Sequence, residues 1–381
     1  MSSTKLKPAN IVSLDASKLT GVMPAISGAN LTGVAPFTVS ASDPAINTNP
    51  SGGLGTLWMN STSGETYILT DATAGANVWT NVGDGDGDVA PYSFQGTVSG
   101  YRSGGESPTK VNIIDKYSFT TDGNATDVGD LAAALVFASG QTSETHGYTS
   151  GGHLGPPTNV IQKFSFSVNG NATDVGDLTA ARGYSAGQSS STHGYTSGAN
   201  PESSPAAVII DKFTFASNNN ATDVGDLTVG LSSSTGQSSS THGYHTNGTT
   251  GTRVTTVQKF AFASDGNASN VGNTTSAASY SAGISSATHG YTAGGNTPTP
   301  VNIIDRFAFA SDGTAADVGD MTGAKEGVDG TSSTTEGYIH GGYLSGSYLN
   351  VIEKFTYAAS ANATDVGDLT SGSYGGAGTQ V

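Results

Sequence analysis

The chain contains no cysteine among its 381 residues, which excludes disulfide bonds and cysteine-ligated metal sites. It has 14 lysines and arginines against 30 aspartates and glutamates, and the net charge of −16 repels nucleic acid phosphates and anionic membranes. No apolar run is long enough for a membrane-spanning helix. Residues 1–9 are polar and carry no signal-type apolar run, so we expect synthesis in a cytosol and no membrane insertion.

Tryptophan is also scarce, with two residues, whereas 54 glycines, 15 tyrosines and 13 phenylalanines are present. Abundant glycine, together with Ser, Thr, Asn and Asp, favours turns and short strands over helices. The tyrosines and phenylalanines recur at regular places and are numerous enough to build a core, which argues against a disordered chain. The composition therefore favours an all-β fold.

The strongest pattern is an internal repeat. Its first marker is a Gly-Tyr dipeptide that recurs at intervals of 47 or 49 residues. Its second marker is Asp-Val-Gly-Asp or a near copy, and an aromatic segment such as NVIQKFSF (159–166) lies between the two markers. The Gly-Tyr tyrosines are Tyr101, Tyr148, Tyr195, Tyr244, Tyr291 and Tyr338. The chain therefore carries six copies of one unit.

Each unit is interpreted as four short strands. The strands are exemplified by residues 182–189, 193–199, 159–166 and 171–178. The third strand alternates, which places aromatic pairs such as Phe164 and Phe166 on one face. One such unit cannot bury its aromatic residues alone, so neighbouring units are expected to stack and share a core.

The segment 149–187, with its Gly-Gly, aromatic strand and Asp-Val-Gly-Asp-Leu, resembles the Kelch repeat. It departs from that repeat at Val175, where a tryptophan is usual. The resemblance implies a propeller, and residues 94–105 and 371–381 align with a second and a first strand of the same unit. We therefore expect a six-bladed Kelch-like β-propeller over 92–381, closed by the C-terminal strand and preceded by a small N-terminal β attachment region.

The first ninety residues lack the repeat. Residues 1–40, with two copies of Leu-Thr-Gly-Val, resemble attachment and trimerisation segments of bacteriophage tail fibres. Residues 55–85 alternate apolar and polar residues, resemble a module of phage virion proteins, and predict three strands with Trp58 and Trp79 in their core. We assign this small β-unit to residues 41–83. Residues 84–91 are expected to be an acidic Gly/Asp linker, because the EF-hand glycine and final glutamate are missing.

Variation between the repeats is concentrated between the second and third strands. In a four-stranded blade these loops share one rim, opposite the end where the chain begins its first blade. This arrangement suits an adhesin, although relaxed loops without a ligand remain the alternative. The loop residues best suited to stacking and hydrogen bonding with a sugar are Tyr343, Tyr348, His153, His245 and Arg253.

Three repeated patterns have both a chemical and a structural interpretation. Histidines at the turn between the first two strands could form a metal ring, but hydrogen bonds at that turn are favoured. The Asp/Asn-rich turns offer oxygens for calcium, but hydrogen-bonded Asx turns are favoured and no cofactor is expected. The basic residue on each third strand could hold an anion, but pairing on the strand surface is favoured. The four histidines are His146, His193, His242 and His289.

No catalytic set accompanies the repeat. Sialidase boxes, a Cys–Tyr cofactor and the hydrolase and zinc-protease motifs are missing from the sequence, so we expect no enzymatic activity. The favoured function is a phage virion structural protein, a tail or head fibre, that displays a propeller for host-surface recognition. The alternatives are a purely structural capsid or baseplate decoration protein and, least favoured, an extracellular Kelch-like enzyme.

The resemblance to tail fibres also implies partners and a location. We expect the N-terminal region to contact other virion proteins and to form a homotrimer. The propeller is expected to meet a host-surface glycan or protein, and the acidic chain is not expected to bind nucleic acid. The mature protein is therefore expected in the virion.

Overall fold

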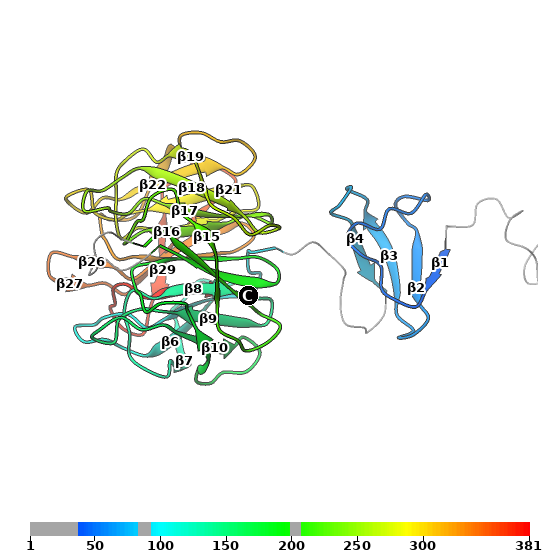
Figure 1. Cartoon of the computed structure of the whole chain (residues 1–381), viewed down its shortest axis with the longest axis horizontal. Helices are drawn as coiled ribbons and strands as arrows, with labels where there is room; N and C mark the ends of the chain where they lie inside the picture. The colour runs from blue at the N-terminus through cyan, green and yellow to red at the C-terminus, as the bar shows by residue number, and fades with distance from the viewer. Residues whose placement is uncertain (1–36, 83–92, 199–206) are drawn as a thin grey trace, which may run out of the picture. The chain divides into compact units, whose positions relative to one another are not determined.

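The computed structural model describes residues 37–82, 93–198 and 207–381. The chain divides into two compact units, residues 1–91 and 92–381, which are considered separately (Figure 1). Every regular element of the described ranges is a β-strand, which confirms the all-β prediction. These ranges contain no helix that could cross a membrane. The predicted acidic linker and all but the last four residues of the predicted attachment segment lie outside the described residues.

The first unit is a four-stranded sheet of β1 (Phe37–Ser40), β2 (Leu57–Asn60), β3 (Thr66–Asp71) and β4 (Val78–Asn81). Strand β1 runs parallel to β2, and the other pairs are antiparallel. The prediction of three strands starting after residue 40 was wrong in this respect. Strand β1 has only four residues and pairs with a strand that follows a long loop, so local alternation does not reveal it.

The core of the first unit lies on one face of its sheet. Tyr67, Leu69 and Trp79 are buried there, and the rings of Trp58 and Trp79 meet edge to face at 5.8 Å. The Trp58 indole N–H donates to the carbonyl of Ser42 at 2.9 Å, in the loop between β1 and β2. The prediction that both tryptophans pack in the core is therefore confirmed.

The second unit consists of repeated four-stranded sheets, numbered here from the first to the sixth. The first sheet contains β30 (Ala377–Gln380), β5 (Ser99–Ser103), β6 (Ile113–Ser118) and β7 (Thr126–Asp130). The second contains β8 (Ser139–Thr142), β9 (His146–Ser150), β10 (Val160–Ser165) and β11 (Thr173–Asp177). The third contains β12 (Ala186–Ser189), β13 (His193–Ser197), β14 (Ile209–Thr214) and β15 (Thr222–Asp226).

The remaining sheets have the same antiparallel order. The fourth contains β16 (Thr235–Ser238), β17 (His242–Thr246), β18 (Thr256–Ala261) and β19 (Ser269–Asn273). The fifth contains β20 (Ala282–Ser285), β21 (His289–Ala293), β22 (Ile303–Ala308) and β23 (Ala316–Asp320). The sixth contains β24 (Asp329–Ser332), β25 (Glu336–His340), β28 (Val351–Thr356) and β29 (Thr364–Asp368). The connection between β25 and β28 of the sixth sheet contains a short hairpin of β26 (Tyr343–Leu344) and β27 (Ser347–Tyr348).

Neighbouring sheets share aromatic cores. Tyr148 of the second sheet packs on Phe213 and Phe215 of the third, with ring centroids 5.4 and 4.9 Å apart. The same contact joins the sixth sheet to the first, where the ring of Tyr338 lies 4.8 Å from that of Phe119. The Gly-Tyr tyrosine and the aromatic pair of the next third strand therefore form one packing unit, which explains why both recur in every repeat.

Backbone hydrogen bonds also join successive sheets. The N–H of Ala172 in the second sheet donates to the carbonyl of Asp130 in the first at 2.8 Å. The N–H of Ala125 in the first sheet donates to the carbonyl of Asp368 in the sixth at 2.7 Å. The first strands of neighbouring sheets lie side by side, including β24 with β30 and β30 with β8. The sheets are therefore linked at both their inner and their outer strands.

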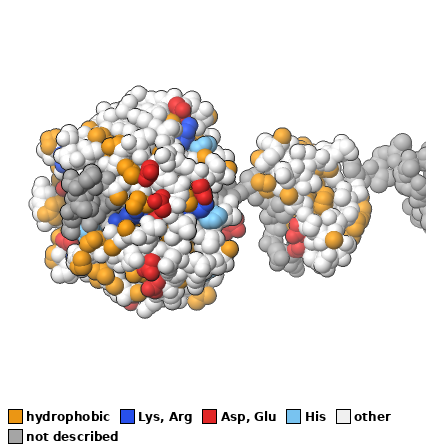
Figure 2. Space-filling view, viewed as in Figure 1, with side chains coloured by type: hydrophobic (Ala, Val, Ile, Leu, Met, Phe, Trp, Pro, Cys, Tyr) orange, Lys and Arg blue, Asp and Glu red, His pale blue; other side chains and the backbone are white. Residues whose placement is uncertain are grey.

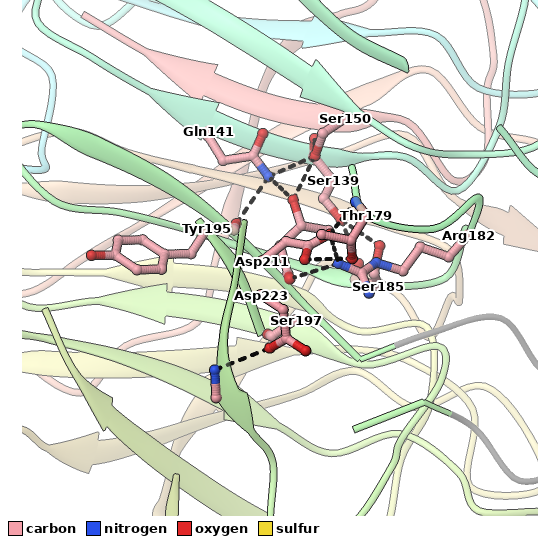
Figure 3. A network of polar contacts seen from close by, with 12 residues as sticks. Ser139, Gln141, Ser150, Thr179, Arg182, Ser185, Tyr195, Ser197, Asp211 and Asp223 are labelled. Carbon is pink, nitrogen blue, oxygen red and sulfur yellow. Dashed lines mark hydrogen bonds and ion pairs between the residues drawn. The ribbon is translucent and has the colours of Figure 1, made fainter. Parts of the chain in front are cut away.

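Buried polar side chains form further hydrogen bonds and ion pairs between neighbouring sheets (Figure 3). Asp211 of β14 accepts hydrogen bonds from the backbone N–H of Thr179 at 2.9 Å and from its hydroxyl at 2.7 Å. It also forms a buried ion pair with Arg182. Gln141 of β8 donates from its amide to the carbonyl of Tyr195 in the next sheet at 3.1 Å. These bonds satisfy polar groups that would be costly to bury alone.

Candidate functional site

An axial cavity of about 120 Å³ runs between the first strands of the sheets in the second unit. Glycines with equivalent positions on these strands line its middle, and a Cβ on Gly187 would lie 2.1 Å from the carbonyl oxygen of Gly140. The six glycines are Gly140, Gly187, Gly236, Gly283, Gly330 and Gly378. Phe94 lines the cavity near the segment where the chain joins the second unit. We call this end the base and the opposite end, where the first strands begin, the loop end.

Six equivalent residues form a ring at the loop end, which we call the mouth ring. Each has a positive φ between 54° and 65°. Each backbone N–H donates to the carbonyl of the equivalent residue in the neighbouring sheet at 2.7 to 2.9 Å, so the bonds run through all six sheets. The members are Phe137, Tyr184, Ser233, Tyr280, Gly327 and Gly375. A positive φ costs about 1 kcal/mol or more for a residue other than glycine, so the ring holds its aromatic members in a strained backbone.

Four half-buried aromatic side chains converge at this end, and we call them the mouth cluster. Phe137 is central: its ring stacks on Tyr184 at 4.0 Å and meets Tyr374 at 5.0 Å and Tyr280 at 5.8 Å. The rings of Tyr184 and Tyr280 lie 6.0 Å apart. The cluster therefore presents several ring faces and edges within one small area of the surface.

Ser233 interrupts the aromatic part of the mouth ring. It lies between Tyr184 and Tyr280 in the order of the ring bonds and is only 4% exposed. Its hydroxyl oxygen is buried and has no hydrogen-bond partner among the described residues. Burying an unpaired hydroxyl is unfavourable, so this oxygen is a potential point of ligand recognition.

Two carboxylates border the mouth cluster. Tyr348 donates from its hydroxyl to Glu106 at 2.9 Å, and this bond raises the pKa of Tyr348. Burial raises the pKa of Tyr374 strongly, and the neighbouring Tyr280, Glu326 and Glu106 add to this effect. The site therefore combines a neutral aromatic surface with hydrogen-bonding groups at its edge.

The structure brings two of the five sequence-predicted ligand residues to this site. Tyr343 and Tyr348 lie on the β26–β27 hairpin with their rings 5.3 Å apart. The ring of Tyr343 also meets that of Tyr374 at 5.8 Å, so the hairpin extends the mouth cluster.

The two predicted histidines are not displayed for sugar binding. His245 is fully buried on β17, at a position where three other sheets carry a threonine, and its Nδ1 shares a 2.8 Å hydrogen bond with Ser197. Burial lowers the pKa of His245 to about 3. His153 is 5% exposed and its ring packs 4.9 Å from that of Tyr184. Burial between neighbouring elements is the physical reason that neither ring can stack on a surface ligand.

Arg253 is half-buried and forms hydrogen bonds to neighbouring loops. Its guanidinium donates to the hydroxyl of Ser279 at 3.1 Å and to the side-chain oxygen of Asn296 at 2.7 Å. These bonds hold Arg253 against the fifth sheet and leave it outside the mouth cluster.

Sequence reasoning missed the mouth cluster because it considered only the loops between second and third strands. Phe137, Tyr184 and Tyr280 lie in the connections that precede first strands. Each is 11 residues before the Gly-Tyr tyrosine of its own sheet. Alignment of the repeats on that tyrosine would have revealed an aromatic residue at the same position in three sheets.

The repeated histidines make the predicted turn hydrogen bonds. His146 shares a 2.8 Å bond between its Nδ1 and the hydroxyl of Thr145, and the three equivalent histidines do the same. The predicted Asx turns are also confirmed, since Asp127 accepts from the N–H of Gly129 at 3.1 Å. Within the described ranges, no group of three or more acidic or histidine side chains is arranged to hold a metal.

The basic residues of the third strands pair partly as predicted. Lys354 forms an ion pair at 3.3 Å with Glu336 on the neighbouring strand of its own sheet, which is the predicted strand-surface pairing. Lys259 instead pairs with Asp312 at 2.6 Å, and Lys354 also pairs with Asp122 at 2.7 Å. These two aspartates lie in the turn after the next sheet's third strand, which the prediction did not include. The long lysine side chain reaches the neighbouring sheet, so the pairing links repeats.

Comparison with protein-family models and with curated protein sequences finds no match to this chain.

Proposed function

We propose that residues 92–381 form a closed six-bladed Kelch-like β-propeller that a bacteriophage fibre displays for host-surface recognition. The proposed role is structural and adhesive, without enzymatic activity or a cofactor. The half-exposed mouth cluster at the loop end is the observation that carries this proposal. Aromatic residues held rigidly at a surface are a common basis for recognition of glycans and proteins.

Contacts between the sixth and first sheets support closure. Strand β30 from the C-terminus pairs with β5, which follows the start of the unit. The Ala125 to Asp368 hydrogen bond and the Tyr338 to Phe119 ring contact then repeat the links seen between all other neighbours. A closed arrangement of this kind leaves no open inner edge.

The path of the chain supports display of the loop end. At the base, Gly96 donates to the carbonyl of Ser332 at 2.9 Å, and Gln380 donates to the carbonyl of Phe94 at 2.8 Å. The segment that joins the second unit is thus bound at the base. The chain therefore enters the second unit at the base, and the loop end is the opposite end of that unit.

The uncovered face of the first unit supports the proposed homotrimer. Phe37 and Val39 are 51% and 57% exposed, and they pair with Leu57 and Met59 on the same face. Five of the nine exposed large hydrophobic residues in the described ranges lie in this small unit, whose visible surface carries such residues (Figure 2). These strand positions are uncharged, so equivalent faces of other copies can meet despite the net charge of −16.

Sedimentation of the full chain tests this assembly. We expect an oligomer that Val39→Glu dissociates and that Val168→Glu leaves intact, because Val168 is 69% exposed but lies in the second unit. A monomeric wild-type chain, or an oligomer that survives Val39→Glu, would overturn the proposed interface. Fluorescence of Trp58 and Trp79 checks that the first unit remains folded, since the chain has no other tryptophan.

Host recognition is tested by binding of the labelled full chain to intact candidate host cells. We expect saturable binding, and we expect phage particles that lack residues 1–83 of this protein to lose it from the virion. Failure of the folded chain to bind any host that the phage infects would reject the recognition role.

A purely structural decoration protein is the second candidate. It is favoured by the buried His245 and by the bonds that tie Arg253 to its neighbours, because these residues stabilise the loops rather than display them. Particle incorporation without host binding would support this candidate.

A further inference from the structure

We propose that the mouth of the axial cavity binds one neutral saccharide residue, which stacks on the mouth cluster and hydrogen-bonds to Ser233. This inference rests on the proposed recognition function and names the ligand class of its site. The argument uses the aromatic geometry, the buried hydroxyl and the distribution of charge.

The mouth cluster fits the apolar face of a sugar ring. Phe137 contacts each of the other three rings, and all four side chains remain partly exposed. The backbone bonds of the mouth ring hold Phe137, Tyr184 and Tyr280 in place. A rigid aromatic surface loses little conformational entropy when a ligand stacks on it, which favours binding.

Ser233 provides the polar contact that a saccharide requires. Ser233 lines the axial cavity together with Phe137, Tyr184 and Tyr280, and its hydroxyl has no partner among the described residues. In the mouth ring, the equivalent residues Gly327 and Gly375 have no side chain. The buried hydroxyls of Ser234 and Ser281 also lack partners among the described residues and line the same cavity, so they add polar atoms beside Ser233. A sugar hydroxyl at this point would satisfy Ser233, and water would be displaced from the aromatic faces.

The charge around the mouth favours a neutral ligand. The partly exposed charges of the described surrounding loops are Glu106 and Glu326 against Lys110 and Arg253. Asp329 lines the cavity and is paired with the buried Arg102 at 2.8 Å. Arg182 and Lys325 lie close to the mouth ring in sequence, but both are buried in ion pairs with Asp211 and Glu353.

The loop end consequently has no excess positive charge to offset the chain's net charge of −16. An anionic sugar, such as one with a carboxylate, would be repelled at low ionic strength. A neutral hexose or N-acetylhexosamine would not.

The repeat itself suggests variants that should fold. Serine already occupies the mouth ring at Ser233 with a φ of 54°, close to the 63° of Tyr280. Tyr280→Ser therefore places a serine in a backbone conformation that the protein already uses. Likewise, Ser233→Gly reproduces the residue found at Gly327 and Gly375.

Binding of the full chain is measured on an array of neutral and carboxylated glycans and by saturation-transfer NMR with free monosaccharides. We expect Tyr280→Ser to weaken binding about tenfold through lost stacking, and Ser233→Gly to weaken it about fivefold through a lost hydrogen bond. Leu154→Ala is the matched control, because Leu154 is 45% exposed in a loop at the same end but outside the mouth cluster.

The outcomes separate this inference from the proposed function. Binding to host cells that Tyr280→Ser does not weaken would overturn the saccharide site and leave host recognition intact. Saccharide binding lost in Tyr280→Ser, without binding to cells, would support the site and reject the host role. A preference for carboxylated glycans, or no saccharide binding by the folded chain, would also overturn the inference.

Discussion

The single sheet of residues 37–82 and the repeated sheets of residues 93–381 cover their apolar faces in different ways. The single sheet buries one face under its own loop and leaves Phe37 and Val39 exposed on the other. Each repeated sheet instead packs between neighbours, so that Tyr148, for example, contacts aromatic residues of the next sheet. A small core thus stabilises the first unit alone, whereas contacts between repeats stabilise the second.

The largest expected effect is on the small core. Trp79 is fully buried, so Trp79→Ala should destabilise the first unit by about 4 kcal/mol. We expect Trp58 fluorescence to report an unfolded first unit while the far-UV circular dichroism melting transition of the second unit is unchanged. A shift of both transitions would contradict the separation of the two units.

The reverse test breaks the packing of the first strands. A Cβ on Gly236 would lie 2.1 Å from the carbonyl oxygen of Gly187, so Gly236→Ala should destabilise the second unit by about 3 kcal/mol. The control is Gly155→Ala, where a Cβ meets no atom within 4 Å. The melting temperature of the second unit should fall for Gly236→Ala and not for the control, and the tryptophan fluorescence of the first unit should not change. Equal melting temperatures for the two variants would refute close packing at the glycines.

Protonation of histidine in acid should lower the stability of the second unit only, because every histidine of the chain lies in that unit. The pKa of His245 is lowered to about 3, and that of His340 is also far below its usual value because of burial. Both are neutral when folded, so their stabilising contribution is complete above the unfolded pKa of about 6.5 and is lost as pH falls below it. His245 alone should cost about 2 kcal/mol at pH 5.

Urea unfolding at pH 7.5 and pH 5 measures this effect. His245→Thr should flatten the pH dependence, because Thr149 and Thr196 occupy the equivalent position in other sheets. The first unit has no histidine between residues 37 and 82 and provides an internal control. If the free energy of unfolding depends on pH as strongly in His245→Thr as in the wild type, His245 is not buried in its neutral form.

The smallest effect concerns one side-chain link between sheets. Asn171 accepts a hydrogen bond from the N–H of Asp130 at 3.0 Å, and its removal in Asn171→Ala should cost about 1 kcal/mol. The fifth sheet has Thr314 at this position, so Thr314→Asn should add the bond and raise the melting temperature. If both substitutions leave melting unchanged, the backbone bonds at the same turn are sufficient.

The sequence by itself determined the strands, the repeat and the need for neighbouring units to stack on one another. Gly-Tyr, the aromatic pair and Asp-Val-Gly-Asp are local patterns, and their regular spacing predicts four strands per unit. Trp58 and Trp79 were predicted as core residues for the same reason, since large apolar residues in alternating strands face one side. These features depend on a few neighbouring residues.

Only the tertiary structure decided which residues meet at the axis and which are buried between sheets. Phe137, Tyr184 and Tyr280 are far apart in the sequence, and they converge because equivalent backbone atoms of all six sheets bond in one ring. His245 was predicted to be a loop residue, but it lies within β17 at the position of Thr196 in the third sheet, and it is fully buried. Such contacts follow from the stacking of whole sheets, and the physical reason is that no single repeat contains both partners.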